Sequence, residues 1–116
     1  SIIAVVSTLI SGELVTSIYS YDEKSYFSFS GDLQKQSVSL FDFSRSCNIS
    51  ATPQSENEYS IFDYGVSNYV TLKIDGSEFS GFDYRSSTFF SGRAQNESIS
   101  FFDNEDSSYH NYTYSN

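Results

Sequence analysis

The sequence predicts an all-β fold, an antiparallel barrel or a sandwich built from about five hairpins. The first observation is that Phe-Asp recurs at Phe41, Phe62, Phe82 and Phe102, in steps of 21, 20 and 20 residues. Self-similarity at a fixed period indicates that one supersecondary unit is repeated along the chain. The second is that an alternation of apolar residues with Ser, as in Val38-Ser39-Leu40, leads into each Phe-Asp step. Such alternation is typical of half-buried strands.

The first element, residues 1–12, lies outside the repeat and has no charged or aromatic residue. Its apolar side chains are Ile2, Ile3, Ala4, Val5, Val6, Leu9 and Ile10. The segment is shorter than the ~20 residues that span a bilayer, and its β-branched content favours an extended strand buried on both faces. Three roles fit it: a strand that plugs or closes its own barrel, a remnant of a signal-peptide core, or a polymerisation strand that completes a neighbouring subunit.

Residues 13–116 form the predicted repeat domain. Its first copy is fainter, with Tyr19-Ser20 one beat before Phe41-Asp42. A short polar loop follows the dipeptide and leads, in four of the five copies, to a second aromatic-rich run, which predicts a β-hairpin. Gly31, Gly76 and Gly92 are expected to mark the exits from one hairpin to the next. Because an open sheet leaves unpaired edges, about ten such strands should close on themselves.

The Phe-Asp step interrupts the apolar alternation. Leu40 and Asp42 fall on one face of the strand and Phe41 falls on the other. Either both faces are covered, or a β-bulge shifts the phase at this step. A bulge next to the hairpin loop, with the Asp carboxylate accepting backbone N–H groups of the loop, explains why the dipeptide recurs. We therefore assign a structural role to the repeat-step residues Phe41, Asp42, Phe62, Asp63, Phe82, Asp83, Phe102 and Asp103.

Composition restricts the partners and the cellular location. The formal net charge of −9 argues against nucleic acid and anionic membranes, which both require basic patches. The single cysteine, Cys47, excludes an intramolecular disulfide, and we expect it to be buried in a position that holds Tyr or Phe in other copies. The absence of Met, even at position 1, predicts either a processed end or a fragment of a longer precursor. We expect a secreted protein, extracellular or on a cell surface. Three sequons make Asn48, Asn96 and Asn111 candidate N-glycosylation sites.

Sequence signals for catalysis are weak. His110 is the only histidine, so a His-based metal site or a Ser-His-Asp triad has no second histidine to draw on. Residues 103–106 carry calcium-type ligands but lack the EF-hand spacing. Repeated aspartates at equivalent positions are typical of a scaffold rather than of an acid/base pair. We expect no enzymatic activity, no metal and no cofactor.

Two resemblances bear on function. The step-and-hairpin pattern of residues 14–116, as in Phe62-Asp63-Tyr64, resembles uncharacterised bacterial and environmental proteins with short Tyr-Asp-Tyr hairpin repeats. The apolar N-terminus resembles donor-strand subunits of extracellular filaments, in which such an arm inserts into the next subunit. The chain departs from chaperone–usher pilins, which usually carry a disulfide and an immunoglobulin-like pattern. The second resemblance implies head-to-tail, heterologous contacts between copies and hence a helical filament.

These observations favour a structural subunit of an extracellular filament, with itself as partner and residues 1–12 as the inter-subunit strand. The alternative is a secreted monomeric glycan-binding domain, similar to a lectin or adhesin, in which exposed Tyr and Phe rings stack on sugars. The two hypotheses differ in what they need: the filament requires residues 1–12, whereas the glycan-binding domain binds its ligand as a monomer.

Overall fold

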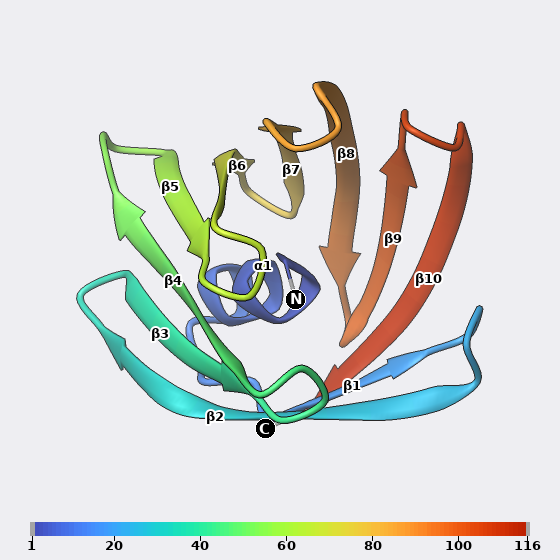
Figure 1. The fold of residues 1–116 in the computed structure, drawn as a ribbon, viewed down its shortest axis with the longest axis horizontal. Coiled ribbons are helices and arrows are strands. Elements are labelled where there is room, and N and C mark those ends of the chain that lie inside the picture. The colour runs from blue at the N-terminus through green and yellow to red at the C-terminus, as the bar shows by residue number, and fades with distance from the viewer. Residues whose placement is uncertain (1, 116) are drawn as a thin grey trace.

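Ten antiparallel strands follow one another as a meander and close into a barrel, because the first strand pairs with the last (Figure 1). The structure is a computed structural model that describes residues 2–115. The strands are β1 (Ser17–Ser20), β2 (Ser25–Gln34), β3 (Ser37–Asp42), β4 (Cys47–Pro53), β5 (Glu58–Asp63), β6 (Asn68–Asp75), β7 (Glu78–Asp83), β8 (Thr88–Gln95), β9 (Ser98–Asp103) and β10 (Ser108–Ser115). The all-β barrel and its five hairpins are as the sequence predicts.

The segment that precedes the repeat is a helix, and the prediction of an extended strand there is wrong. Helix α1 (Ile2–Ser11) lies within the ring of strands (Figure 1); Ser1 lies outside the described residues. Its buried apolar side chains are Ile3, Ala4, Val5 and Val6, and Ile2, Leu9 and Ile10 pack partly buried against the core. A closed barrel has no unpaired edge to offer a further strand, whereas a helix satisfies its own backbone groups.

Local interactions complete α1 and turn the chain toward β1. The Ser7 and Thr8 hydroxyls donate to the carbonyl oxygens of Ile3 and Ala4, one turn earlier. Gly12 follows the helix at φ 76° and donates its N–H to the carbonyl of Thr8, which is the glycine-terminated ending common in helices. No helix among residues 2–115 is long and apolar enough to cross a membrane.

The strand at the Phe-Asp step is regular, so the predicted alternative of a β-bulge is wrong there. β3 pairs with β2 from Ser37 to Asp42 without a skipped residue. Val38, Leu40 and Asp42 are all buried, whereas Phe41, between Leu40 and Asp42 in the chain, lies on the outer face. The repeated carboxylate therefore continues the inward row of its strand, while the ring before it continues the outward row.

The repeated aspartates cap the hairpin loops at one end of the barrel. In β3, β5, β7 and β9 the final Asp accepts a hydrogen bond from the backbone N–H two residues later, at 2.9–3.0 Å. In the first hairpin Ser20 takes this position and accepts from the N–H of Glu23. Each of these loops ends on a residue with positive φ: Lys24, Ser46, Ser67, Ser87 and Ser107. The loop-capping role predicted for the aspartates is what these bonds provide.

The best-connected of these caps is Asp42, which is 2% exposed. Burial acts to raise the pKa of Asp42, but hydrogen bonds from Ser44 and Arg45 outweigh it and leave that pKa below 3.8. The Arg45 guanidinium also binds Asp63 at 2.9 Å. Arg45 thus links the caps of two successive hairpins.

The core divides into an aliphatic and an aromatic part. The buried apolar side chains of β3 to β6, such as Leu40, Ile49 and Ile61, are aliphatic apart from Tyr59. From β7 to β9 rings take over, and Phe101 stacks on Phe90 and Phe79 with centroids 5.3 and 6.2 Å apart. The remaining core residues are Val15, Ile18, Phe29, Val38, Ala51, Tyr59, Val70, Leu72, Ala94 and Ile99.

Glycines allow the rings to fit, and this corrects their predicted place in the chain. Only Gly76 lies in a turn between hairpins; Gly31 and Gly92 lie within β2 and β8. A Cβ atom on Gly92 would lie 2.5 Å from Cζ of Phe79, and one on Gly81 would lie 2.4 Å from Cζ of Phe90. Glycine in a strand thus marks a close approach of ring or backbone here, not the end of a hairpin.

The barrel is closed by β1 and β10, and His110 reinforces this seam. His110 lies on β10 and bonds Asp22, in the loop after β1, through Nδ1. Its Nε2 lies 2.9 Å from the Asp106 carboxylate, in the loop before β10. The hydrogen bond to Asp22 contributes most to raising the pKa of His110 above 6.5, with Asp106 adding to it against partial burial. His110 therefore ties the first hairpin to the last through these two carboxylates.

We expect the seam to make the protein more stable at pH 5.5 than at pH 8.5. A pKa that is raised on folding contributes stability below the unfolded value of about 6.5, and this stability is lost as pH rises through the folded value. Thermal melts of the wild type and of His110→Gln across this range test it. His110→Gln should flatten this part of the profile, and an unchanged pH profile in the variant would contradict the assignment.

Candidate ligand-binding grooves on the outer wall

Aromatic rings gather on the outer wall near the Asp-capped end of the barrel. On each hairpin the ring before the capping residue faces the position seven residues later, on the neighbouring strand. The rings pair with centroids 4.7–4.8 Å apart in Tyr19–Tyr26, Phe62–Tyr69, Phe82–Phe89 and Phe102–Tyr109. In four hairpins a further ring, two residues after the ring at the step, packs edge-on against that ring. These further rings are Tyr21, Phe43, Tyr64 and Tyr84. The sequence repeat therefore builds five outer ring clusters.

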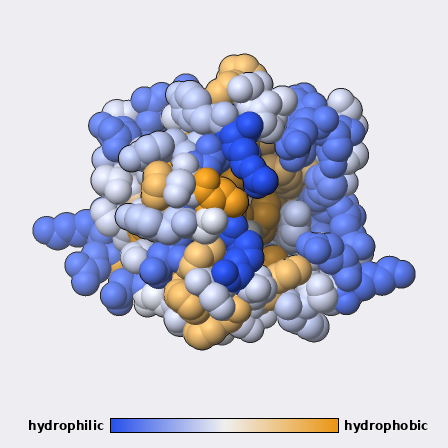
Figure 2. All heavy atoms as spheres, viewed as in Figure 1, coloured by the Kyte–Doolittle hydropathy of each residue, from blue (hydrophilic) through white to orange (hydrophobic). Residues whose placement is uncertain are grey.

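One ring of each pair is largely open to solvent, whereas the ring at the step is half-buried. Tyr26 is 74% exposed, Tyr109 66% and Phe89 65%. Hydrophilic residues cover most of the face seen in Figure 2, with apolar residues showing between them. Exposed rings that are already packed against one another present rigid, amphipathic surfaces to a ligand.

Three grooves run beside these clusters, each between one hairpin and the next. The first, of about 490 Å³, is lined by Ser50, Thr52, Gln54, Ser60, Phe62, Tyr64 and Tyr69. The second, of about 460 Å³, is lined by Gln54, Glu58, Tyr59, Ser60, Thr71, Leu72, Lys73, Ser80, Gly81, Phe82 and Phe89. The third, of about 540 Å³, is lined by Lys73, Asp75, Glu78, Phe79, Ser80, Ser91, Gly92, Arg93, Ser100, Phe102 and Tyr109.

The three grooves have the same plan. Each has the ring pair of one hairpin along one side and Ser or Thr hydroxyls from two or more strands along its floor. The hydroxyls project outward because every second residue of a strand faces the same side. Two residues before the outward-facing Phe62, Phe82 and Phe102 lie Ser60, Ser80 and Ser100. The repeat has therefore produced one kind of groove three times.

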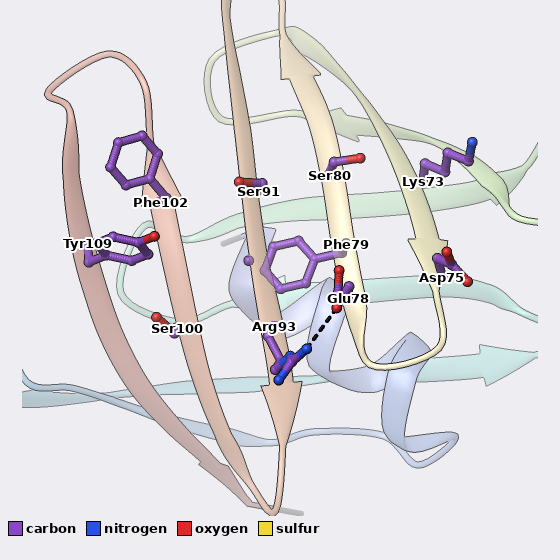
Figure 3. Close-up of a pocket in the computed structure, with 11 residues that line it drawn as sticks. Lys73, Asp75, Glu78, Phe79, Ser80, Ser91, Arg93, Ser100, Phe102 and Tyr109 are labelled. Carbon is purple, nitrogen blue, oxygen red and sulfur yellow. Dashed lines mark hydrogen bonds and ion pairs between the residues drawn. The ribbon is translucent and has the colours of Figure 1, made fainter.

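Figure 3 shows the third groove. Phe102 and Tyr109 lie together on β9 and β10, and Ser91 and Ser80 follow on the next strands. The Arg93 guanidinium, on β8, binds the Glu78 carboxylate, on β7, at 2.8 Å. Lys73 and Asp75 lie beyond them on β6. The groove thus has a ring pair at one side and charged residues toward the other, with hydroxyls and the Phe79 ring between.

Chemically, these grooves are suited to binding polar molecules that have an apolar face. Ser and Thr hydroxyls both donate and accept hydrogen bonds, and the rings offer flat apolar area. No His or Cys lines any of the three grooves in the part of the chain described. Over residues 2–115 there is also no group of three or more His, Cys, Asp or Glu placed to hold a metal ion.

The structure separates the two halves of the predicted Phe-Asp step. Phe62, Phe82 and Phe102 line the grooves, whereas Phe41 lines none of them. Their partners Asp42, Asp63, Asp83 and Asp103 belong to the inward rows and cap loops instead. The seven apolar residues assigned to a polymerisation strand belong to the core helix.

The three candidate glycosylation sites are all exposed. Asn96 lies in the tight turn between β8 and β9 at φ 52°, and Asn111 lies on β10. Asn48 faces Phe41 across β3 and β4, in the position that holds a ring in the other hairpins. The prediction that Cys47 occupies that position is wrong. Cys47 is half-buried opposite Asp42.

Sequence reasoning did not identify the floor and the charged side of the grooves. Ser80, Ser91 and Ser100 belong to a composition in which Ser is common, so nothing distinguishes them before the strands are paired. Their outward phase was the one available signal. Comparisons with protein-family models, with curated proteins and with solved structures find no match to this chain.

Proposed function

We propose that this protein is an extracellular carbohydrate-binding module that holds its ligand in the three outer grooves. The observation that carries this proposal is the repetition of one groove, with an exposed ring pair beside a hydroxyl floor, on three successive hairpins. A sugar ring has an apolar C–H face and a rim of hydroxyls. It can stack on an aromatic ring while its hydroxyls exchange hydrogen bonds with Ser, Thr and Gln.

The exposed rings would cost the protein little to keep ordered. Phe82 and Phe89 pack against each other at 4.8 Å, and Phe62 and Tyr69 at 4.7 Å. Such preorganisation lowers the entropy lost on binding. An extracellular location accords with the exposure of all three sequons, since glycosylation requires passage through a secretory route.

Filament assembly through residues 1–12 stays a prediction. Here residues 2–11 fill the barrel of their own chain as helix α1. Insertion into a neighbour would require α1 to leave the barrel, unfold and become extended. Size-exclusion chromatography with electron microscopy of the full chain tests this prediction. A monodisperse monomer is expected if α1 stays in its own barrel, and helical filaments would favour the donor-strand hypothesis.

Removing one ring from each groove is expected to abolish retention by polysaccharide. The variant is Tyr69→Ala, Phe89→Ala and Tyr109→Ala combined, and the measurement is affinity electrophoresis in gels containing a neutral glucan, mannan or xylan. Loss of one stacked ring should weaken binding about tenfold, or about 1.4 kcal/mol. All three side chains are more than half exposed, so the fold should survive.

Matched controls exist on the same barrel. Phe43 and Tyr26 are 55% and 74% exposed and line none of the three grooves. Phe43→Ala and Tyr26→Ala should leave retention unchanged. Equal losses from groove rings and from these rings would contradict the assignment to the grooves, as would a wild type that no polysaccharide retards.

A further inference from the structure

The grooves do not stand apart from one another. The first and second share Gln54 and Ser60, and the second and third share Lys73 and Ser80. Together they form one path across the outer wall from β4 to β10. The path runs across the strands rather than along them.

The path is longer than one sugar. Neighbouring ring pairs sit on successive hairpins and are therefore two strands apart, or about 10 Å at the usual strand spacing. A single pyranose cannot reach from Phe62 to Phe82, or from Phe82 to Phe102. A chain of several units can place one sugar on each pair.

The charges along the path disfavour an acidic ligand. The whole chain carries a net charge of −9, which repels polyanions at long range. Within the third groove the Arg93 guanidinium already binds Glu78 at 2.8 Å. Glu58 and Asp75 lie in the second and third grooves and add negative charge beside Lys73.

We infer that the ligand is a linear, uncharged polysaccharide that lies across the strands and occupies the three grooves at once. This inference rests on the proposed carbohydrate-binding function and adds the length, charge and direction of the ligand. Each groove then acts as a subsite, and linkage between the sugars makes the second and third contacts intramolecular. Affinity should therefore rise steeply with chain length although each single contact is weak.

Isothermal titration calorimetry with gluco-, manno- and xylo-oligosaccharides tests this, using the disaccharide, tetrasaccharide, hexasaccharide and octasaccharide of each series. For one series the octasaccharide is expected to bind at least about tenfold more tightly than the disaccharide. Phe89→Ala, in the middle groove, should remove most of this gain. The matched variant Phe43→Ala should keep it.

The outcomes separate the two proposals. A disaccharide that binds as tightly as the octasaccharide would overturn the extended ligand and retain carbohydrate binding at one groove. Oligogalacturonate that binds more tightly than every neutral series would overturn the charge assignment. Failure of all oligosaccharides, together with absence of retention in every polysaccharide gel, would overturn the carbohydrate-binding function itself.

Discussion

Replacing Val6 with aspartate is expected to unfold the whole protein. Val6 is fully buried in α1, and α1 lies inside the barrel among the apolar side chains of the strands. A carboxylate there would be shielded from solvent and packed among apolar side chains, which costs several kcal/mol or more of folding free energy. That is comparable with the total stability of about 5–15 kcal/mol of a small domain. The variant should therefore show no cooperative thermal transition by circular dichroism.

Ser11→Asp is the matched control, because it places the same charge on the same helix at an exposed position. Its expected loss is below about 1 kcal/mol, from the unfavourable interaction of an anion with the helix C-terminus. This pair of variants also tests the role of residues 1–12. A Val6→Asp protein that keeps its barrel but no longer assembles into filaments would show that the segment serves a neighbouring subunit, and the core helix would then be wrong.

The strands could be predicted because the repeat supplies their number and phase. Phe62-Asp63 and Phe82-Asp83 mark where the first strand of each hairpin ends and its loop begins, and alternation indicates which residues point inward. The helical conformation of residues 2–11 could not be predicted in the same way. The β-branched side chains of this segment favour a strand locally, but the ten strands of the closed barrel leave no edge with which a further strand could pair. Closure of the barrel, a property of the whole chain, decides the conformation of the segment.

Of the candidate site, the rings could be predicted from the repeat, whereas the grooves beside them could not. The rings Phe62, Phe82 and Phe102 could be found because they repeat. The aspartates that follow them repeat equally, but they cap loops and line none of the grooves. The grooves depend on residues of neighbouring hairpins, such as Ser60 and Ser80 on either side of the second groove. Only the pairing of β6 with β7 brings those hairpins together.

Gly81→Ala is expected to destabilise the barrel by several kcal/mol. An alanine Cβ at this position would lie 2.1 Å from the carbonyl oxygen of Thr71, on β6, and 2.4 Å from Cζ of Phe90, on β8. A shift of the Phe90 ring would disturb its stacking on Phe101, whose centroid lies 5.3 Å away. The carbonyl cannot shift without loss of pairing between β6 and β7. Overpacking that displaces backbone as well as side chains exceeds the usual cost of about 1–3 kcal/mol.

Gly76→Ala separates this steric effect from the general cost of replacing a glycine. Gly76 lies in the turn after β6 at φ 63°, and a Cβ there would meet nothing within 4 Å. Its expected loss, about 1 kcal/mol, comes from the left-handed backbone alone. Urea unfolding of both variants measures the difference. Equal losses would mean that β6 and β8 do not approach Gly81 as described. A larger loss at Gly81, with Phe90→Leu restoring only part of it, would identify the Thr71 carbonyl as the contact that requires glycine.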